Sequence, residues 1–158
     1  MKRRVFESIS KDLLKKMVFV SGPRQTGKTT LAKSFEDSYQ THYYNWDKDS
    51  DRLALKKNQL DESAELWIFD EIHKNRQWRN WIKGLYDTQK NEKKFLITGS
   101  ARLDIYRYGG DSLQGRYFSY RLHPITFSEM LGQRTQDYTN FFELGRGASR
   151  TSDLINLN

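Results

Sequence analysis

The chain has 158 residues, no cysteine and a formal net charge of +7, a size that fits one domain with its own core. The lack of cysteine excludes disulfides and thiolate metal sites, and no apolar run approaches the roughly 18 residues of a membrane span. The basic residues 1–4 are not followed by an apolar stretch, so they do not form a secretion signal. We therefore expect a cytoplasmic protein with no membrane contact.

The predicted elements alternate between helices and short apolar strands. Apolar positions at helical spacing indicate helices, and short apolar runs bounded by turn residues indicate buried strands. Strands are expected at 17–20, 43–46, 66–69, 95–98 and 117–122, and helices at 5–14, 30–35, 52–59, 76–90, 102–106 and 128–131. Residues 109–111 read as an open loop. This alternation predicts an α/β fold, in which a parallel sheet is covered on both faces.

A phosphate-binding loop is the most specific motif in the sequence. Residues 22–29 match G-x-x-x-x-G-K-[ST] without a departure, between a predicted strand and a predicted helix. In that context backbone N–H groups and the helix N-terminus surround a phosphate, Lys28 reaches the β and γ oxygens, and the Thr29 hydroxyl ligates Mg²⁺. The predicted nucleotide-binding residues are Gly22, Pro23, Arg24, Gln25, Thr26, Gly27, Lys28, Thr29 and Thr30.

A second motif follows the third predicted strand, where Asp70 and Glu71 come after four apolar residues. The carboxyl end of a parallel strand is where open α/β folds bind ligands. There Asp70 can hold Mg²⁺, directly or through water and Thr29, and Glu71 can orient and deprotonate an attacking water. A kinase would need an acceptor site more than a water-activating carboxylate, so hydrolysis is favoured over phosphate transfer.

The fourth predicted strand ends in Thr98, Gly99 and Ser100. If this strand lies between the first and the third, the Ser100 hydroxyl emerges beside the γ-phosphate and can position the lytic water. The alternative is an ordinary Gly-Ser turn. His73 follows the acidic pair closely enough to touch the site, although a structural role is the simpler interpretation.

Taken together, these motifs resemble AAA-type ATPases of the P-loop class, in particular a bacterial and archaeal family with a downstream domain of unknown function. The similar segments are 22–31, 69–74 with Trp78, 97–103, 112–116 and 122–129. The resemblance implies ATP and Mg²⁺, a three-layer αβα sandwich with sheet order 2-3-4-1-5, and the roles given above to Asp70, Glu71 and Ser100. ATP is also favoured because the sequence has no guanine-reading Asn/Thr-Lys-x-Asp pattern.

The resemblance also suggests a domain boundary. Residues 1–131 correspond to the ATPase core, and residues 132–158 read as a polar extension or as the remnant of a lid region that family members carry. The chain is thus expected to be either truncated or naturally short, and no arginine is left for the usual lid position.

Arg116 is the candidate for an arginine finger that acts across a subunit boundary in a homo-oligomer. A guanidinium is planar, always charged and bidentate, which suits the charge that develops on a transferring phosphoryl group. A surface salt bridge is the alternative, and Arg102 and Arg107 are rivals. Arg24, within the loop, can cover the nucleotide or pair with an acid.

Two functions follow from these residues. The first is Mg²⁺-dependent ATP binding and hydrolysis coupled to a conformational change in a partner or attached domain. The second is a nucleotide-dependent binding module with negligible hydrolysis, with DNA or an unidentified protein as its partner, which the basic segments would serve. A small-molecule phosphotransferase is a third and weaker alternative.

Overall fold

The computed structural model describes residues 3, 5–100, 113–125 and 129. The predicted helix at 102–106, the loop at 109–111, and residues 132–158 lie outside this part of the chain, as do Arg102 and Arg107. Of the predicted helix at 128–131, only Glu129 is described, and it is helical. Over the described ranges, no helix is long and apolar enough to cross a membrane.

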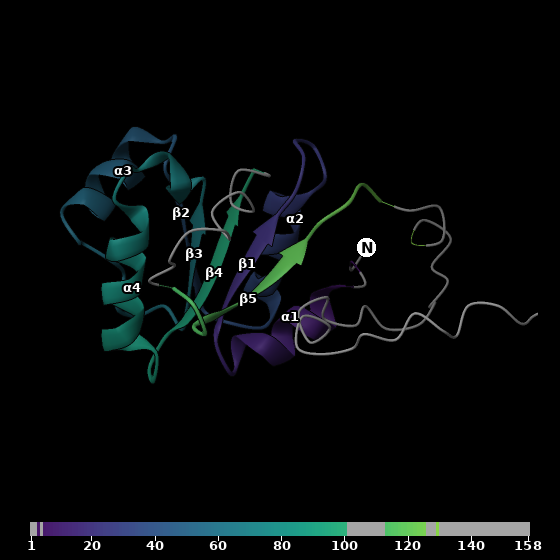
Figure 1. Cartoon of the computed structure of the whole chain (residues 1–158), viewed down its shortest axis with the longest axis horizontal. Coiled ribbons are helices and arrows are strands. Elements are labelled where there is room, and N and C mark those ends of the chain that lie inside the picture. Colours follow the sequence, from purple (N-terminus) through teal and green to yellow (C-terminus); the bar gives the residue numbers. More distant parts are fainter. Residues whose placement is uncertain (1–2, 4, 101–112, 126–128, 130–158) are drawn as a thin grey trace, which may run out of the picture.

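A five-stranded parallel sheet with the order β2-β3-β4-β1-β5 forms the centre of the fold (Figure 1). The strands are β1 (Met17–Ser21), β2 (Thr41–Asn45), β3 (Leu66–Asp70), β4 (Lys94–Gly99) and β5 (Tyr117–Arg121). All five strands were expected from the sequence, and the order implied by the family resemblance is confirmed. β4 therefore lies between β1 and β3, which was the condition for bringing Ser100 to the phosphate loop.

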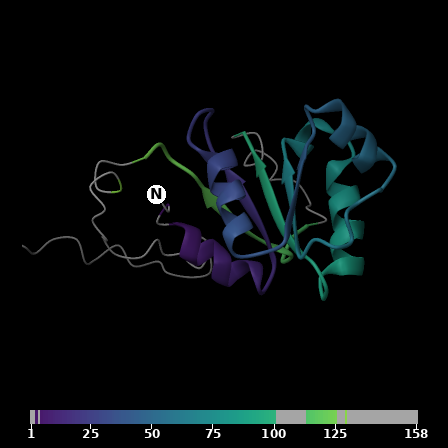
Figure 2. The same ribbon diagram turned by 180° about the vertical axis from the view of Figure 1, so that it is seen from behind.

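Helices cover both faces of the sheet. They are α1 (Val5–Leu13), α2 (Lys28–Lys33), α3 (Asp49–Lys56) and α4 (Trp78–Gln89), with short 3-10 helices η1 (Ser34–Asp37) and η2 (Ile72–Lys74). Seen from behind, α1 and α2 cross in front of the central strands, while α3 and α4 lie to the side (Figure 2). The arrangement is the three-layer αβα sandwich of P-loop NTPases.

Alternate side chains of the strands supply two separate cores, as expected for a sheet buried on both faces. Phe19 and Phe69 face α3 and α4, where they pack with Trp78, Ile82 and other apolar residues. Val18 and Ile68 face α1 and α2 and pack with Ile9, Leu31 and their neighbours. The sheet is therefore held from both sides, and its carboxyl edge is a rigid platform for the loops that follow β1, β3 and β4.

The start of α3 differs from the prediction. The helix was expected at 52–59, with the preceding residues 47–51 as its turn and N-cap, but it begins at Asp49. Asp49 and Asp51 thus lie in the first helical turn, where carboxylates interact favourably with the positive end of the helix dipole. The helix therefore begins three residues earlier than the sequence predicted, and the turn before it is correspondingly shorter.

Candidate functional site

The phosphate loop leaves β1 at its carboxyl end and leads directly into α2. Three of its residues have positive φ angles: Gly22 at 156°, Gln25 at 63° and Gly27 at 86°. When residues with positive and negative φ angles alternate, successive backbone N–H groups point toward the same side and form an anion-binding concavity. At Gly22 the need for glycine is also steric, because a Cβ there would lie 2.3 Å from the carbonyl oxygen of Leu122.

Lys28 is the first residue of α2, and its side chain turns back over the loop. Its Nζ atom donates to the carbonyl oxygens of Gly22 at 2.9 Å and Pro23 at 2.5 Å. Burial lowers the pKa of Lys28, and the nearby carboxylates of Glu71 and Asp70 oppose that shift. The ammonium group is thus held inside the concavity by two carbonyl oxygens, whose place the oxygens of a phosphate could take.

Asp70, the last residue of β3, is fixed by three hydroxyl groups. Thr98 donates to its Oδ1 atom at 2.6 Å, Thr29 donates to its Oδ2 atom at 3.2 Å, and the Tyr43 hydroxyl makes a short hydrogen bond to the same Oδ2. These side chains meet because β1, β3 and β4 end at the same level of the sheet. Asp70 pairs with Thr98 across β3 and β4, and Ser21 pairs with Gly99 across β1 and β4. Burial and the hydrogen bond to Asp70 raise the pKa of Tyr43, which keeps its hydroxyl a donor.

Glu71 follows Asp70 in a left-handed backbone conformation with φ 57° and ψ 19°. For a residue other than glycine this conformation costs on the order of 1 kcal/mol and is found at functional sites. The Glu71 N–H donates to the carbonyl oxygen of Thr98 at 2.9 Å, which ties the turn to β4. The carboxylate is partly exposed, facing the same space as the phosphate loop.

His73 links Glu71 to Ser100, a relationship that the sequence did not reveal. Its Nε2 atom lies 3.3 Å from the Oγ atom of Ser100 and 3.5 Å from Oε2 of Glu71. Lys74 lies 3.6 Å from the same Glu71 oxygen and also pairs with Asp47 at 2.5 Å. The His73 side chain is only 5% exposed. The left-handed turn at Glu71 and the 3-10 helix after it bring His73 back to the site.

Arg3 contacts the phosphate loop from the other side, and this too was not anticipated. Its guanidinium donates to the carbonyl oxygens of Thr26 at 2.9 Å and His123 at 2.7 Å, and pairs with Glu129 at 3.2 Å. The side chain is 10% exposed. Each of the three guanidinium nitrogens of Arg3 therefore has a hydrogen-bond partner within the protein.

The loop and the acidic pair enclose a hollow of about 410 Å³. The residues that line it are Arg24, Gln25, Gly27, Lys28, Thr29, Thr30, Asp70 and Glu71. Every one of these was predicted from the sequence to bind nucleotide, bind metal or act in catalysis. Arg24 is exposed, with no ion pair to any described residue.

The Thr29 and Asp70 oxygens fit a magnesium ion whose remaining ligands are water molecules and phosphate oxygens. Thr29 Oγ1 and Asp70 Oδ2 are 3.2 Å apart, so one cation could contact both. Within the described ranges, no cluster of three or more His, Cys, Asp or Glu side chains could hold a metal. Mg²⁺ characteristically uses one or two protein oxygens together with waters and substrate phosphates, and this donor set matches that pattern.

Arg116 lies at the opposite end of the sheet from this hollow. It immediately precedes β5, and its carbonyl accepts from the N–H of Met17, the first residue of β1. Its guanidinium forms two hydrogen bonds with the carboxylate of Asp87, at 2.8 and 3.2 Å. A strand of five residues spans roughly 16 Å, so Arg116 does not contribute to the phosphate site of its own chain.

A parallel sheet of this order, with the loop after β1 and an acidic pair after β3, defines a P-loop nucleotide-binding protein. A family model described as "AAA domain" matches residues 14–131. The chain belongs to this AAA family.

The curated relatives share less than 30% sequence identity with this chain. Uncharacterized proteins of Mycobacterium bovis and Mycobacterium tuberculosis are each 29% identical over 116 residues, which is 72% of this chain and 26% of theirs. An uncharacterized protein of Haemophilus influenzae is 24% identical over 136 residues, 75% of this chain and 34% of its own. The chain therefore spans only about a quarter to a third of these relatives.

Among solved structures, the chain is similar to a Bacteroides Pif1 bound to ssDNA. The TM-score is 0.49 and the identity 16%, over 84% of this chain and 45% of that one. A likeness at this level carries no argument about activity.

Proposed function

We propose that this chain binds ATP with Mg²⁺ and hydrolyses it to ADP and phosphate. The observation that carries the proposal is the convergence of Thr29, Asp70 and Lys28 at one edge of the sheet, with Glu71 beside them. A cation and a triphosphate need this combination of hard oxygen ligands, an ammonium group and a backbone concavity. ATP rather than GTP is supported by the family and by the lack of a guanine-reading pattern.

In this proposal the residues of the loop hold the phosphates and those of β3 hold the metal. Lys28 would exchange its carbonyl partners for β and γ oxygens, and Thr29 and Asp70 would ligate Mg²⁺, which neutralises charge on those oxygens when bound. Tyr43 and Thr98 orient Asp70, so that its Oδ2 stays directed at Thr29. The Ser100 hydroxyl would sense or position groups at the γ-phosphate.

Glu71 is proposed as the general base. Its carboxylate accepts a proton from a water molecule whose oxygen attacks the γ-phosphorus, while the bond from that phosphorus to the β–γ bridging oxygen breaks. The bridging oxygen leaves with ADP, the new P–O bond is part of the released phosphate, and Glu71 returns its proton to that phosphate or to solvent. Strain in the left-handed backbone at Glu71 supports this role, because such strain is retained where a side chain must be aimed.

The test is phosphate release from Mg²⁺-ATP by the 158-residue chain beside its Glu71→Gln variant, with nucleotide binding measured in both. Turnover by the parent, and binding without turnover by the variant, would support a base at Glu71. If both proteins bind and neither turns over, the chain is a binding module that needs a further component for hydrolysis. Failure of both to bind nucleotide would overturn the proposal.

Arg116 remains our candidate for a finger that acts on a neighbouring subunit. Its position at the far edge of the sheet supports action in trans rather than in cis. Arg116→Ala should then abolish any turnover that rises with protein concentration, whereas Asp87→Ala, which releases the guanidinium, should preserve it. Equal losses in both variants would instead indicate that the ion pair is structural.

Coupling of hydrolysis to a conformational change is supported by Arg3. One guanidinium joins Thr26 of the phosphate loop to His123 and Glu129, so a change of loop shape has a direct path to the segment after β5. A role in DNA binding is supported separately by the formal net charge of +7.

A further inference from the structure

The carboxylate of Asp70 is enclosed by hydroxyl groups from three elements. Thr98 of β4 donates to Oδ1 at 2.6 Å. Thr29 of α2, at 3.2 Å, and Tyr43 of β2 both donate to Oδ2. An ionised carboxylate only accepts hydrogen bonds, and each of its oxygens accepts about two of them. Both accepting positions on Oδ2 are therefore taken by hydroxyl groups of the protein.

The Oδ1 atom of Asp70 does not offer another position toward the phosphate loop. Oδ1 lies against the hydroxyl of Thr98, a residue that is completely buried. Asp70 itself is only 6% exposed. Oδ2 is thus the carboxylate oxygen that faces Thr29, one of the residues that line the hollow of the proposed nucleotide site.

Tyr43 differs from the other two donors because it belongs to the edge strand β2. It pairs with Ile68, two residues before Asp70, so only a long side chain can carry a hydroxyl to the end of β3. Its ring packs against the core beneath α1 and α2. The ammonium group of Lys33 lies 5.5 Å from the ring centre. These contacts hold the ring, so the fold sets the position of the hydroxyl at Oδ2.

The hydrogen bonds to Oδ2 affect different cations differently. The Thr29 hydroxyl can donate to Oδ2 while its oxygen ligates a cation, since a hydroxyl both donates and accepts. The Tyr43 hydroxyl, however, must be displaced before a cation can contact Oδ2 directly. Mg²⁺ keeps several of its water molecules and can be held through one of them, whereas Ca²⁺ takes about 6–8 oxygen ligands, carboxylates among them. The loss of a direct carboxylate contact therefore weakens Ca²⁺ more than Mg²⁺.

We propose that Tyr43 is a specificity-determining residue, whose hydroxyl competes with a cation for Oδ2 of Asp70 and thereby favours Mg²⁺ over Ca²⁺. The proposal rests on the function proposed above in one respect, namely that Asp70 holds the cation of a bound nucleotide. Of the two ways in which Asp70 can hold that cation, directly or through water, the hydrogen bonds to Oδ2 favour the second. This role goes beyond orienting Asp70, because a residue that only orients the carboxylate affects both cations alike.

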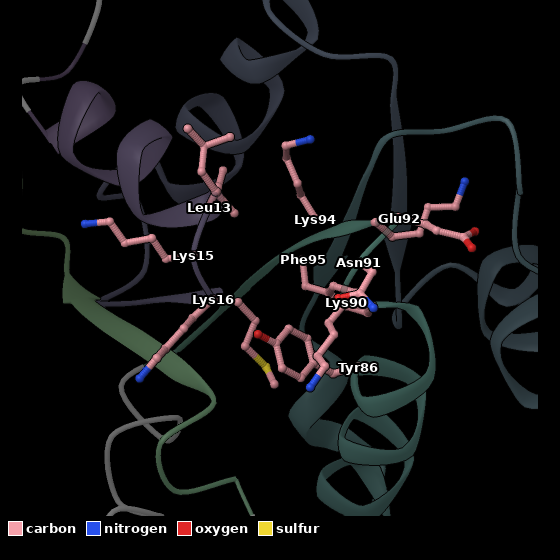
Figure 3. Close-up of a pocket in the computed structure, with 12 residues that line it drawn as sticks. Leu13, Lys15, Lys16, Tyr86, Lys90, Asn91, Glu92, Lys94 and Phe95 are labelled. Atoms are coloured by element: carbon pink, nitrogen blue, oxygen red, sulfur yellow. The ribbon is translucent and has the colours of Figure 1, made fainter.

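The hollow at the amino-terminal edge of the sheet does not compete for the cation (Figure 3). It lies where α1 and α4 end and β4 begins. Among the described residues that line it, Glu92 alone carries a carboxylate, and the other charged residues are lysines. A divalent cation of this kind requires several oxygen ligands. An effect of the cation on nucleotide binding therefore reports on the site at Asp70.

The experiment measures the affinity of the 158-residue chain for fluorescent N-methylanthraniloyl-ADP, with either Mg²⁺ or Ca²⁺ as the sole divalent cation. An ADP probe is used because its binding needs no hydrolysis. Tyr43→Phe removes the hydroxyl and keeps the ring with its contacts to the core and to Lys33. Tyr44→Phe is the matched control. It removes the hydroxyl that accepts from the N–H of Asp61, at the next residue of the same strand and in the core on the opposite face of the sheet.

We expect Tyr43→Phe to strengthen Ca²⁺-supported binding roughly ten-fold relative to Mg²⁺-supported binding, about the effect of one hydrogen bond to a charged group. Tyr44→Phe should leave the ratio of the two affinities unchanged. An unchanged ratio in Tyr43→Phe, or the same change in both variants, would overturn the proposal and leave Tyr43 with an orienting role alone.

The parent chain provides a measurement that does not depend on how well the variants fold. It should bind the ADP probe more tightly with Mg²⁺ than with Ca²⁺, and equal affinities would overturn the proposal. If the parent shows no cation-dependent binding of the probe, the proposed function fails and this inference fails with it. Cation-dependent binding with a ratio that Tyr43→Phe does not alter overturns the inference alone.

Discussion

The Nε2 atom of His73 lies 3.3 Å from the Oγ atom of Ser100, and both residues are supplied by loops that follow strands of the same sheet. Because His73 also lies 3.5 Å from a Glu71 oxygen, it forms a bridge between the proposed sensor and the proposed base. The Ser100 hydroxyl and the Glu71 carboxylate therefore contact the same nitrogen of one imidazole ring. We expect His73 to act as a positioning residue for Glu71 in the proposed hydrolysis.

His73→Ala should reduce ATP turnover by roughly 10- to 100-fold, because a misplaced base loses much of its effect. Nucleotide affinity should change little, since His73 does not line the hollow. If the bridge is the cause, the double variant with Ser100→Ala will be no slower than the slower single variant. His42→Ala, at a histidine paired with Asp61, is the matched control. Equal loss of nucleotide binding would instead indicate a structural histidine.

Lys28→Met should remove the stabilisation of the protein by Mg²⁺-ATP. At a nucleotide concentration 100 times the dissociation constant, a bound ligand stabilises the folded state by about 2.7 kcal/mol, which thermal unfolding detects. Lys33→Met, at an exposed lysine on the same helix, should keep the full thermal shift. A ligand-induced shift in both variants would show that the loop lysine does not bind the nucleotide.

Gly22→Ala should destabilise the fold by about 1–3 kcal/mol, because the added methyl group meets a backbone oxygen that cannot move alone. Gly84→Ala is the matched control. No atom lies within 4 Å of a Cβ built at Gly84 in α4, so alanine should stabilise the helix by about 0.5–1 kcal/mol. Urea unfolding of the two variants gives the comparison, and a stable Gly22→Ala protein would contradict the close packing of Leu122 on the loop.

Tyr43→Phe should make the stability of the protein less sensitive to alkaline pH. Burial raises the pKa of Tyr43 in the folded state. Its contribution is therefore complete below the unfolded-state value of about 10 and is lost as the pH rises above it, when the unfolded chain releases the proton first. Unfolding midpoints from pH 8 to 11 should fall more steeply for the parent than for the variant. If the two proteins show the same dependence of unfolding midpoint on pH, ionisation of Tyr43 is not the cause of the loss of stability at alkaline pH.

The strands and the phosphate loop were predictable because their signals are local. Apolar runs such as 66–69 are buried on both faces and need no partner to be recognised, and the loop pattern fixes Lys28 and Thr29 by spacing alone. The position of Asp70 followed from the rule that ligands gather at the carboxyl ends of parallel strands. Thr98, by contrast, was recognised only as the end of a strand, not as a hydrogen-bond donor to Asp70.

The contacts that were missed all depend on tertiary structure. Arg3 is 23 residues from Thr26 and 126 from Glu129, and no sequence spacing links them. His73 reaches Ser100 only because Glu71 adopts a left-handed conformation, which favours glycine and is not signalled by glutamate. The distance of Arg116 from its own phosphate loop, however, could have been inferred, since a residue before a parallel strand lies at the amino edge.

The three-way attachment of Arg3 has a mechanical consequence. A guanidinium is planar and rigid, so its three contacts cannot move independently of one another. Suppose that the Thr26 carbonyl shifts when the loop closes on a ligand. The guanidinium group must then either move His123 and Glu129 with it or lose its hydrogen bond to one of them. Arg3 thus works as a linkage, through which a change in the shape of the phosphate loop can shift Glu129, more than one hundred positions away along the sequence.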